Sequence, residues 1–261
     1  MEEKSLMNQV HRYADGELIP GEAPLVQEFP LVLRVNDREL VTLIASPHDL
    51  RFLVAGFLRV QGFVAAPEDF LILSVCNDYG IANVRIRGEI PADLKPVLTS
   101  GCGTGITFSL PGAETLEDRW SDSPPVSAAA VFELMKRLAL LSEKYSKHGG
   151  VHSAAVGDCE GRLLLHAEDI GRHNTVDRLA GEALLRGVPL EGTLLVSSGR
   201  VSAEMAAKAA TLGVRLIASR TSPTDMAVTI CQKAGIVLIG YLKVGRFTVY
   251  AHPEQLLVPH A

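Results

Sequence analysis

The fold is decided by residues 193–241, which read TLLVSS, GRVSAEMAAKAATLG, VRLIAS, RTSPTDMAVTICQKAG and IVLIGY in consecutive pieces. Three short apolar runs, typical of buried strands, alternate with two segments of helical length and spacing. Each predicted helix has a hydroxyl residue at its start, Ser202 before residues 203–212 and Thr224 before residues 225–234. Strands separated by helices of this length pair in parallel through right-handed crossovers. The sequence therefore predicts an α/β fold with a parallel sheet in its C-terminal half.

The segments just upstream continue the same alternation. Two apolar runs, VHSAAVG at 151–157 and RLLLHA at 162–167, flank a polar turn and predict two more strands. Helices are predicted at about residues 174–186 and 127–147, from their length and their polar starts. Together these segments predict a three-layer α/β lobe over about residues 126–258.

The N-terminal part has a different character and is rich in predicted β-hairpins. One hairpin spans residues 30–45, and a second joins LILSVC to IANVRIR through residues 77–80. Between them, residues 50–58 place apolar side chains at helical spacing, with Ser46 as the expected N-cap. The expected organisation is a polar tail at 1–19, a smaller hairpin-rich lobe at about 20–112, a linker at 111–125 and then the α/β lobe.

The composition is that of a globular protein that acts in water. Of 261 residues, 47% are apolar and 21% are charged, which is enough apolar surface to bury a core. No run approaches the ~18 apolar residues that cross a bilayer, and the start MEEKSLMNQVHRYADGE lacks the apolar core of a secretory signal. The net charge of −5 argues against a nucleic-acid surface. We therefore expect a cytoplasmic protein that binds neither membrane nor nucleic acid.

The four cysteines lie far apart and include no C-x-x-C pair, which excludes zinc-finger spacing. Cys76, Cys159 and Cys231 sit in or beside apolar runs and are expected to be small buried side chains. Cys102 differs, because in TSGCGTG three glycines surround the sulfur and leave bare N–H groups that could stabilise a thiolate. The alternative is an incidental cysteine in a turn.

Polar residues collect where three consecutive predicted strands end. The carboxyl ends of parallel strands share one edge of a sheet, and ligands bind there. Guanidinium groups and helix N-termini both favour phosphate, so the sequence predicts an anionic, nucleotide-like ligand at this edge. The alternative is that the cations are solvated or paired with surface carboxylates. The residues concerned are Ser198, Arg200, Ser219, Arg220, Lys243 and Arg246.

Nucleotide chemistry of the common kinds is disfavoured, because no P-loop and no G-x-G-x-x-G follows a strand. The stretch EDIGRHN at 168–174 could move protons through Asp169 and His173. The alternative is that Asp169 and Asn174 organise a helix start, while Arg172 pairs with Asp169 or Asp177. His152, in VHSAA, is more often a hydrogen-bonded core residue than a ligand, and zinc deamination is excluded because its cysteine pair is missing.

Several stretches together resemble the FdhD family (FdhD/NarQ type) of formate dehydrogenase accessory sulfurtransferases. They include ASPHDLRFLVAGFLRVQG, SGCGTG, GGVHSAA and EDIGRHNTVDRL, followed by SGRVSAEMAAKAA, ASRTSPT and GYLKVGRFTVYAHP. Their order and spacing extend the resemblance over about residues 20–258.

The resemblance implies a cytidine-deaminase-like fold without the zinc site, and no structural metal. It implies a sulfurtransferase that takes persulfide sulfur from a cysteine desulfurase and passes it to the molybdenum (or tungsten) bis-molybdopterin guanine dinucleotide cofactor of formate dehydrogenase. The family's persulfide cysteine falls on Cys102. Its cofactor-binding stretch, which would hold the guanine-nucleotide part, falls on Tyr241, Leu242, Lys243, Val244, Gly245 and Arg246.

One departure from the family pattern concerns the cysteine loop. Many members carry C-G-x-C, whereas Gly105 stands at the second cysteine position here. One thiolate suffices to carry a persulfide, and the missing neighbour removes a route that would discharge it as a disulfide. Two alternatives remain: a non-catalytic chaperone that inserts the finished cofactor, and a nucleotide hydrolase using Asp169 and His173. The apolar strands and two-lobed organisation also favour a homodimer.

Overall fold

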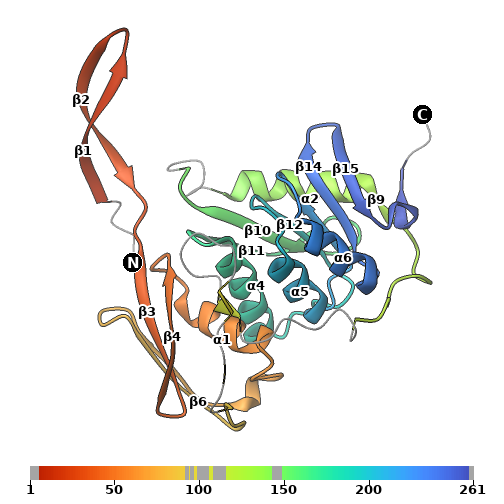
Figure 1. The fold of residues 1–261 in the computed structure, drawn as a ribbon, viewed down its shortest axis with the longest axis horizontal. Coiled ribbons are helices and arrows are strands. Elements are labelled where there is room, and N and C mark those ends of the chain that lie inside the picture. The colour runs from red at the N-terminus through yellow and green to blue at the C-terminus, as the bar shows by residue number, and fades with distance from the viewer. Residues whose placement is uncertain are drawn as a thin grey trace.

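The computed structural model of the chain describes residues 6–91, 94, 97–98, 106–107, 116–142 and 149–258. A six-stranded sheet in the order β11-β10-β12-β13-β14-β15 forms its centre (Figure 1). The pairs β12–β13 and β13–β14 are parallel, as predicted, and the other three are antiparallel. The strands are β10 (His152–Gly157), β11 (Leu163–Asp169), β12 (Leu194–Ser197), β13 (Leu216–Ser219), β14 (Val237–Lys243) and β15 (Arg246–Ala251).

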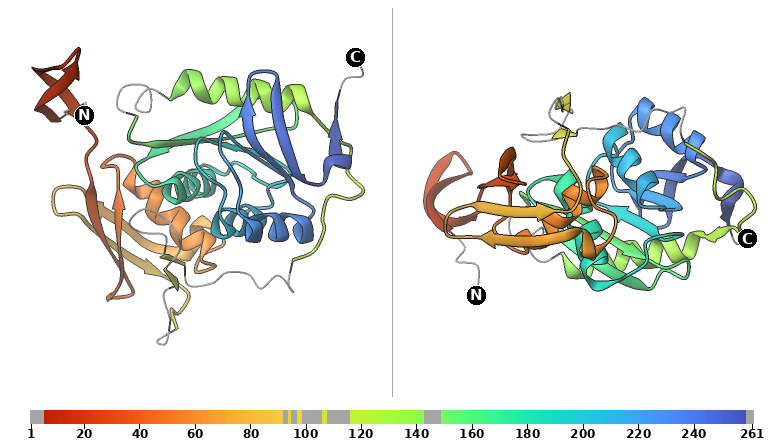
Figure 2. Two further views of the ribbon diagram at one scale, coloured as in Figure 1. Left: turned by 45° about the horizontal axis from the view of Figure 1, so that its top comes forward. Right: turned by 90° about the horizontal axis from the view of Figure 1, so that it is seen from below.

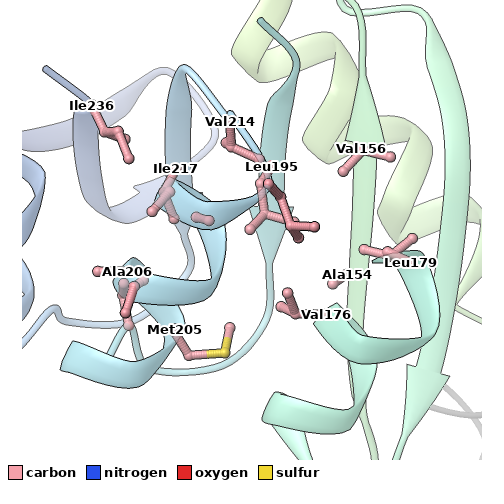
Figure 3. Packing of buried hydrophobic residues seen from close by; sticks show 14 of the residues in the cluster. Ala154, Val156, Val176, Leu179, Leu195, Met205, Ala206, Val214, Ile217 and Ile236 are labelled. Atoms are coloured by element: carbon pink, nitrogen blue, oxygen red, sulfur yellow. The ribbon is translucent and has the colours of Figure 1, made fainter. Parts of the chain in front are cut away.

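Helices cover both faces of this sheet. Helix α2 (Ala128–Leu141) lies on one face, and α4 (Arg172–Arg186), α5 (Ala203–Thr211) and α6 (Asp225–Ala234) lie on the other (Figure 1). The side chains of β10 alternate accordingly: Ala154 and Val156 pack with the second group of helices, in the core shown in Figure 3, and Ala155 packs with α2. The predicted three-layer α/β arrangement is therefore confirmed.

The predicted caps of two helices in this lobe are also confirmed. The side chain of Ser202 accepts a hydrogen bond from the N–H of Met205 at 3.5 Å, and that of Thr224 accepts one from Ala227 at 3.3 Å. These hydroxyls satisfy N–H groups that have no partner within the helix. The starts of α5 and α6 were therefore readable from local sequence.

The smaller lobe is a four-stranded sheet in the order β4-β3-β6-β5, packed against α1 (Leu50–Val60). The predicted cap of α1 is wrong: Asp49 precedes the helix with a φ of 45°, and no side chain caps it. Ser46 instead accepts a hydrogen bond from the N–H of Ile170, 124 positions further on. The remaining elements here are β3 (Phe29–Val35), β4 (Arg38–Ala45), a 3-10 turn at Pro67–Asp69, β5 (Phe70–Cys76) and β6 (Ile81–Ile86).

The two lobes meet where α1 crosses α4. Gly56 and Gly181 face each other at this crossing, and a Cβ on Gly56 would lie 1.6 Å from the carbonyl oxygen of Asp177. A Cβ on Gly181 would lie 1.9 Å from the carbonyl oxygen of Phe52. Only glycine allows two helix backbones to approach this closely. The crossing joins the lobes through backbone contact.

The expected polar tail is wrong for most of its length, because β1 (Leu6–Ala14) and β2 (Glu17–Leu25) form an antiparallel hairpin. Its turn is Asp15-Gly16, with φ of 51° and 91°. Asp-Gly is a strong hairpin signal because both residues tolerate positive φ, and it explains the difference. The hairpin stands away from the rest of the molecule (Figures 1 and 2).

Short elements complete the fold. Residues 116–125, within the predicted linker, contain no helix or strand. In the parts of the chain that are described, no helix is long and apolar enough to span a membrane. The short pieces are β7 (Val97–Leu98) paired with β8 (Ile106–Thr107), β9 (Val126–Ser127) paired with β16 (Leu256–Leu257), and a 3-10 turn at Pro253–Gln255.

Candidate functional site

The loops that follow β12 and β13 are hydrogen-bonded to each other and to the last part of β14, at the carboxyl edge of the sheet. The hydroxyl of Ser219 donates to the carbonyl of Gly199 at 2.7 Å and accepts from the N–H of Thr221 at 3.0 Å. The N–H of Tyr241 then donates to the carbonyl of Thr221 at 3.0 Å. The two loops and the end of β14 therefore lie along one edge, as their positions in parallel strands predict.

Further backbone bonds hold two of these loops together. The N–H of Arg220 donates to the carbonyl of Ser197 at 3.2 Å, and the N–H of Val201 donates to Ser222 at 3.2 Å. The N–H of Thr224 donates back to Val201 at 2.9 Å, which joins the start of α6 to the loop after β12. Side chains carried by these loops are thus held on a rigid backbone.

Four cations project from this edge, which we call the cationic edge: Arg200, Arg220, Lys243 and Arg246 are all exposed. Within the described parts of the chain, Arg220, Lys243 and Arg246 form no ion pair. None of these three cations is therefore paired with a described carboxylate, and solvation is the other half of that alternative.

Two of these cations face each other at the tip of the β14–β15 hairpin. Lys243 and Arg246 are direct cross-strand partners, and Val244-Gly245 forms the turn between them. Like charges directly opposite in a hairpin repel each other. A bound anion would relieve this repulsion, which makes the tip suited to phosphate.

The structure separates the predicted edge residues into two kinds. Ser219 is fully buried with its hydroxyl engaged, and Leu242 packs into the core beneath α2. These two side chains position the loops and cannot reach a ligand from there. Tyr241 and Val244 are exposed, and Ser198 is half-buried at the same edge.

Asp169 organises the turn before α4. Its carboxylate accepts hydrogen bonds from the side chain of Asn174 at 2.8 Å, the N–H of Gly171 at 2.8 Å and the guanidinium of Arg178 at 2.6 Å. The guanidinium at this carboxylate belongs to Arg178, two turns into the helix, and Asp177, the other expected partner of Arg172, pairs with Lys208. A carboxylate with all these partners is a structural anchor.

His173 is enclosed between α4 and α5. Its Nε2 lies 3.1 Å from the hydroxyl of Ser202 and 3.4 Å from a carboxylate oxygen of Glu204. Burial lowers the pKa of His173 to about 3, although Glu204 opposes the shift. The imidazole is therefore neutral and sealed from solvent, and the geometry gives no support to hydrolysis by Asp169 and His173.

A second buried ionic contact lies deeper along α4. Lys208 Nζ lies 2.8 Å from each carboxylate oxygen of Asp177, and both side chains are almost fully buried. Burial raises the pKa of Asp177 to about 6, and Lys208 opposes that rise. Such a pair fixes α5 against α4, because separating the charges in the interior would leave each unpaired.

A cavity of about 230 Å³ opens beside the cationic edge, and no motif in the sequence predicts it. Its wall is one face of α2, and Ser198 and Arg220 come from the cationic edge. Residues 135, 138, 139 and 142 have the spacing of one helix face, which could have indicated this wall of the cavity. The same spacing is equally typical of a helix face that is buried in the core. The lining residues are Met135, Leu138, Ala139, Ser142, Ser153, Ser198 and Arg220.

His152 lies next to this cavity. It is half-buried, and its Nδ1 lies 3.4 Å from the hydroxyl of Ser198. Burial and the nearby Arg172 lower the pKa of His152, so its ring is neutral at physiological pH. The expected hydrogen-bonded histidine is present, at the edge of the core.

The predicted persulfide residue, Cys102, lies outside the described residues. The other three cysteines are free thiols. Cys231 is fully buried, which raises the pKa of its thiol to about 12, and Cys76 and Cys159 are half-buried. The expectation of burial is thus confirmed for Cys231, and Cys159 additionally donates to the carbonyl of Gly192 at 3.4 Å. Among the residues described, no group of three or more histidine, cysteine or acidic side chains could hold a metal ion.

Comparisons with known proteins show which proteins this chain is similar to. The chain is 33% identical over 249 residues to a Staphylococcus haemolyticus protein named sulfur carrier protein FdhD, covering 94% of each chain. It is 32% identical over 257 residues to the Staphylococcus aureus protein of the same name, covering 97% of each.

A solved structure shows the same fold. The chain superposes with a TM-score of 0.77 and 24% identity on the crystal structure of a Desulfotalea psychrophila protein described as a formate dehydrogenase accessory protein, covering 97% of this chain and 99% of that one. The model of the FdhD/NarQ family matches residues 26–257, nearly the whole length. The chain therefore belongs to the FdhD/NarQ family.

Proposed function

We propose that this protein is a sulfur carrier that takes persulfide sulfur from a cysteine desulfurase and delivers it to the molybdenum (or tungsten) bis-molybdopterin guanine dinucleotide cofactor of a formate dehydrogenase. The observation that carries the proposal is the cationic edge, where three side chains have no ionic partner in the described part of a chain of net charge −5. The sulfur-carrier part of the proposal is supported by the names of the two relatives, which are both called sulfur carrier protein FdhD.

Sulfur loading requires only one cysteine. The thiolate of Cys102 attacks the outer sulfur of the desulfurase persulfide, a new S–S bond forms at Cys102, and the desulfurase cysteine leaves as its thiolate. One S–S bond forms as another breaks, so this transfer needs no added oxidant. The loss of a second loop cysteine at Gly105 suits this step, because no neighbouring thiol can displace the carried sulfur. A reducing compartment is needed to keep Cys102 free, so the proposed location is the cytoplasm.

The cofactor is the substrate, and its two guanine-nucleotide arms carry pyrophosphate groups. Arg200, Arg220, Lys243 and Arg246 would neutralise this charge at the cationic edge. Because the loops after β12 and β13 are bonded to each other, binding at Arg200 and Arg220 would order mainly side chains, which lowers the entropic cost.

Arg246→Gln is expected to weaken the binding of guanosine diphosphate about 10- to 100-fold, since a charge-assisted contact to phosphate is lost. Isothermal titration calorimetry at two salt concentrations checks this, with a smaller salt dependence expected for the variant. Activation of formate dehydrogenase by the variant should fall in parallel. Arg162→Gln is the matched control. Arg162 is also an exposed arginine, but it lies in the turn between β10 and β11 and is not part of the cationic edge. Equal affinity of wild type and Arg246→Gln would refute the binding half of the proposal.

The replacement of the second loop cysteine by Gly105 also leaves a place for the chaperone alternative. In that case the protein holds the finished cofactor and inserts it into the dehydrogenase without sulfur chemistry. Both functions need the cationic edge, but only the carrier needs Cys102. A Cys102 variant that still activates the dehydrogenase would therefore favour the chaperone.

A homodimer is the proposed assembly, supported by the β1–β2 hairpin. Tyr13 and Leu18 are cross-strand partners near its tip, and they are 75% and 68% exposed. A lone two-stranded hairpin is marginally stable in water, so its apolar side chains need cover. In a closed two-fold dimer, each copy would cover the apolar side chains of the other copy's hairpin. This is the commonest arrangement of soluble oligomers.

Tyr13→Glu combined with Leu18→Glu is expected to convert a dimer to a monomer, because the two carboxylates would be buried at the interface. Sedimentation velocity measures the mass directly. Tyr79→Glu is the control, since Tyr79 is equally exposed in the turn between β5 and β6. A monomeric wild type, or a double variant that stays dimeric, would contradict the proposal.

A further inference from the structure

A groove of about 650 Å³ lies in the smaller lobe, between β5, the start of α1 and the end of α4. Its lining is mainly apolar and includes Phe70, Leu71 and Leu73 of β5, with Phe52 of α1 and Leu185 of α4. None of its lining comes from the cationic edge. This groove, which we call the β5 groove, is large enough for several side chains of a bound segment.

Beside the groove, β5 is an edge strand of the smaller sheet. In the described part of the chain it pairs with β6 alone. Its sequence FLILSVC has no charged residue, and Leu71 and Ile72 are 53% and 50% exposed. Native proteins protect exposed edges with charges, proline or cover, because the free N–H and C=O groups of an edge pair readily with another strand. The other edge strand of this sheet, β4, begins with the charged residues Arg38 and Glu39, whereas β5 has no such protection.

An extended peptide segment fits the edge and the groove together. A strand added along β5 would pair with its free backbone groups, and every second side chain of that strand would lie on the same face of the sheet. Phe70 and Leu73 pack against the core that contains α1, so the groove is on the α1 face. The side chains that enter the groove would therefore be apolar, and those on the opposite face would meet solvent.

The charges at the rim of the groove favour a segment that carries a carboxylate. Arg186 lies 5.3 Å from the ring centre of Phe52 and is already paired with Glu182 at 2.6 Å. Arg51 is exposed and forms no ion pair with any described residue. Asp49, the acidic residue of the lining, lies 3.2 Å from Nδ1 of His48. The charge of Arg51 is therefore available for a partner's carboxylate.

The chain leaves β6 toward Cys102 beside this groove. Phe70, in the groove, is the cross-strand partner of Ile86, the last residue of β6. The N–H of Arg87 then donates to the carbonyl of Asp69 at 2.9 Å, which fixes the exit from β6 against the turn before β5. A protein docked in the groove would thus lie at the start of the segment that carries Cys102. A sulfur donor has to bind within reach of that segment, because persulfide transfer needs direct contact between sulfur atoms.

We propose that the β5 groove is the docking site of the cysteine desulfurase, which adds an extended apolar segment to β5 and places a carboxylate at Arg51. The inference rests on the proposed function, because the desulfurase is the sulfur donor of that function. It adds the surface at which the donor binds. Docking itself changes no covalent bond, and it accelerates loading because it holds the donor close to its acceptor.

Leu71→Lys tests the strand pairing, because lysine on an edge strand opposes the addition of another strand. Leu71 is exposed, so the variant should fold, which circular dichroism checks. We expect its affinity for the cysteine desulfurase, measured by biolayer interferometry, to fall at least about tenfold. Leu164→Lys is the matched control, since Leu164 is 40% exposed on β11, an edge strand of the central sheet. Unchanged affinity of Leu71→Lys, or an equal loss in the control, overturns the proposal.

Arg51→Glu tests the carboxylate contact. Its affinity for the desulfurase should also fall about tenfold or more, and the loss should be largest at low ionic strength, because salt screens contacts between exposed charges. Lys233→Glu is the control: Lys233 is exposed on α6, outside the lining of the groove, and the substitution changes the charge by the same amount. Equal losses in both variants would reflect net charge and overturn the assignment of Arg51.

Sulfur loading, followed by intact mass, separates docking from the sulfur chemistry. With desulfurase and cysteine, Leu71→Lys should load at least about tenfold more slowly than wild type. Glutathione persulfide, a small donor that needs no docking surface, should load both proteins at the same rate. If the desulfurase loads both equally fast, the docking site is wrong while the carrier function stands. If neither donor loads wild type, the carrier function fails, and the affinities still decide whether the desulfurase docks at β5.

Two further measurements identify a different occupant of the β5 groove. If Leu71→Lys loses affinity for formate dehydrogenase and keeps its affinity for the desulfurase, the groove belongs to the dehydrogenase and the proposal is overturned. If Leu71→Lys has a lower mass than wild type in sedimentation velocity and still binds the desulfurase as wild type does, the occupant is a second copy of this chain, which overturns it as well.

Discussion

Cys102→Ala is expected to abolish sulfur loading, because the variant lacks the thiol that we propose as the carrier. Cys231 is buried with a pKa of about 12, so it stays protonated and cannot attack a persulfide. Cys159 donates its S–H to a backbone carbonyl in the larger lobe. A covalent carrier without its nucleophile has no second route, so activation of the dehydrogenase should fall roughly 1,000-fold or more.

Intact mass spectrometry after incubation with a cysteine desulfurase and cysteine measures the loading. Wild type should gain one sulfur atom that a reducing agent removes, and Cys102→Ala should gain none. Cys159→Ala serves as the matched control and should load like wild type. A sulfur adduct on Cys102→Ala would move the carrier role to another cysteine, and an unloaded wild type beside an active desulfurase would leave only the chaperone function.

Asp169→Asn is expected to destabilise the fold by about 3–5 kcal/mol, the usual cost of leaving one charge of a buried ion pair without its partner. Arg178 is only 2% exposed, and its guanidinium lies 2.6 Å from the carboxylate of Asp169. It also donates to the carbonyl oxygens of Ser46 and His48, in the segment that leads into α1. Loss of the carboxylate therefore loosens the junction between the lobes. Urea unfolding measures the change in free energy.

An exposed pair of the same length is the control. Arg162 lies 2.6 Å from Asp158 but is 76% exposed, so Arg162→Ala should cost about 0–1 kcal/mol. Replacing both buried partners, as Asp169→Leu with Arg178→Met, should recover part of the loss because no charge is left unpaired. If Asp169→Asn costs no more than Arg162→Ala, the pair contributes no more to stability than a surface contact.

The sequence by itself determined most elements of the two lobes and their order. The alternation of strands and helices after residue 151, the caps at Ser202 and Thr224, and the hairpin patterns of the smaller lobe are all local signals, and the structure confirms them. The cationic edge followed as well, because parallel strands bring their carboxyl ends together whatever the details of packing. The Asp15-Gly16 turn carried an equally local signal for the first hairpin.

The tertiary structure alone decided the partners of individual side chains. Ser46 has the spacing of a helix cap but bonds across to Ile170, and Asp169 selects Arg178 over the neighbouring Arg172. Ser219 carries a hydroxyl that suits a ligand, yet it is fully buried and holds a loop. These partners depend on distances in space, and they lie between 9 and 124 positions apart in the sequence. Local spacing sets which way a side chain points along its own element, but only the packed fold sets what it meets there.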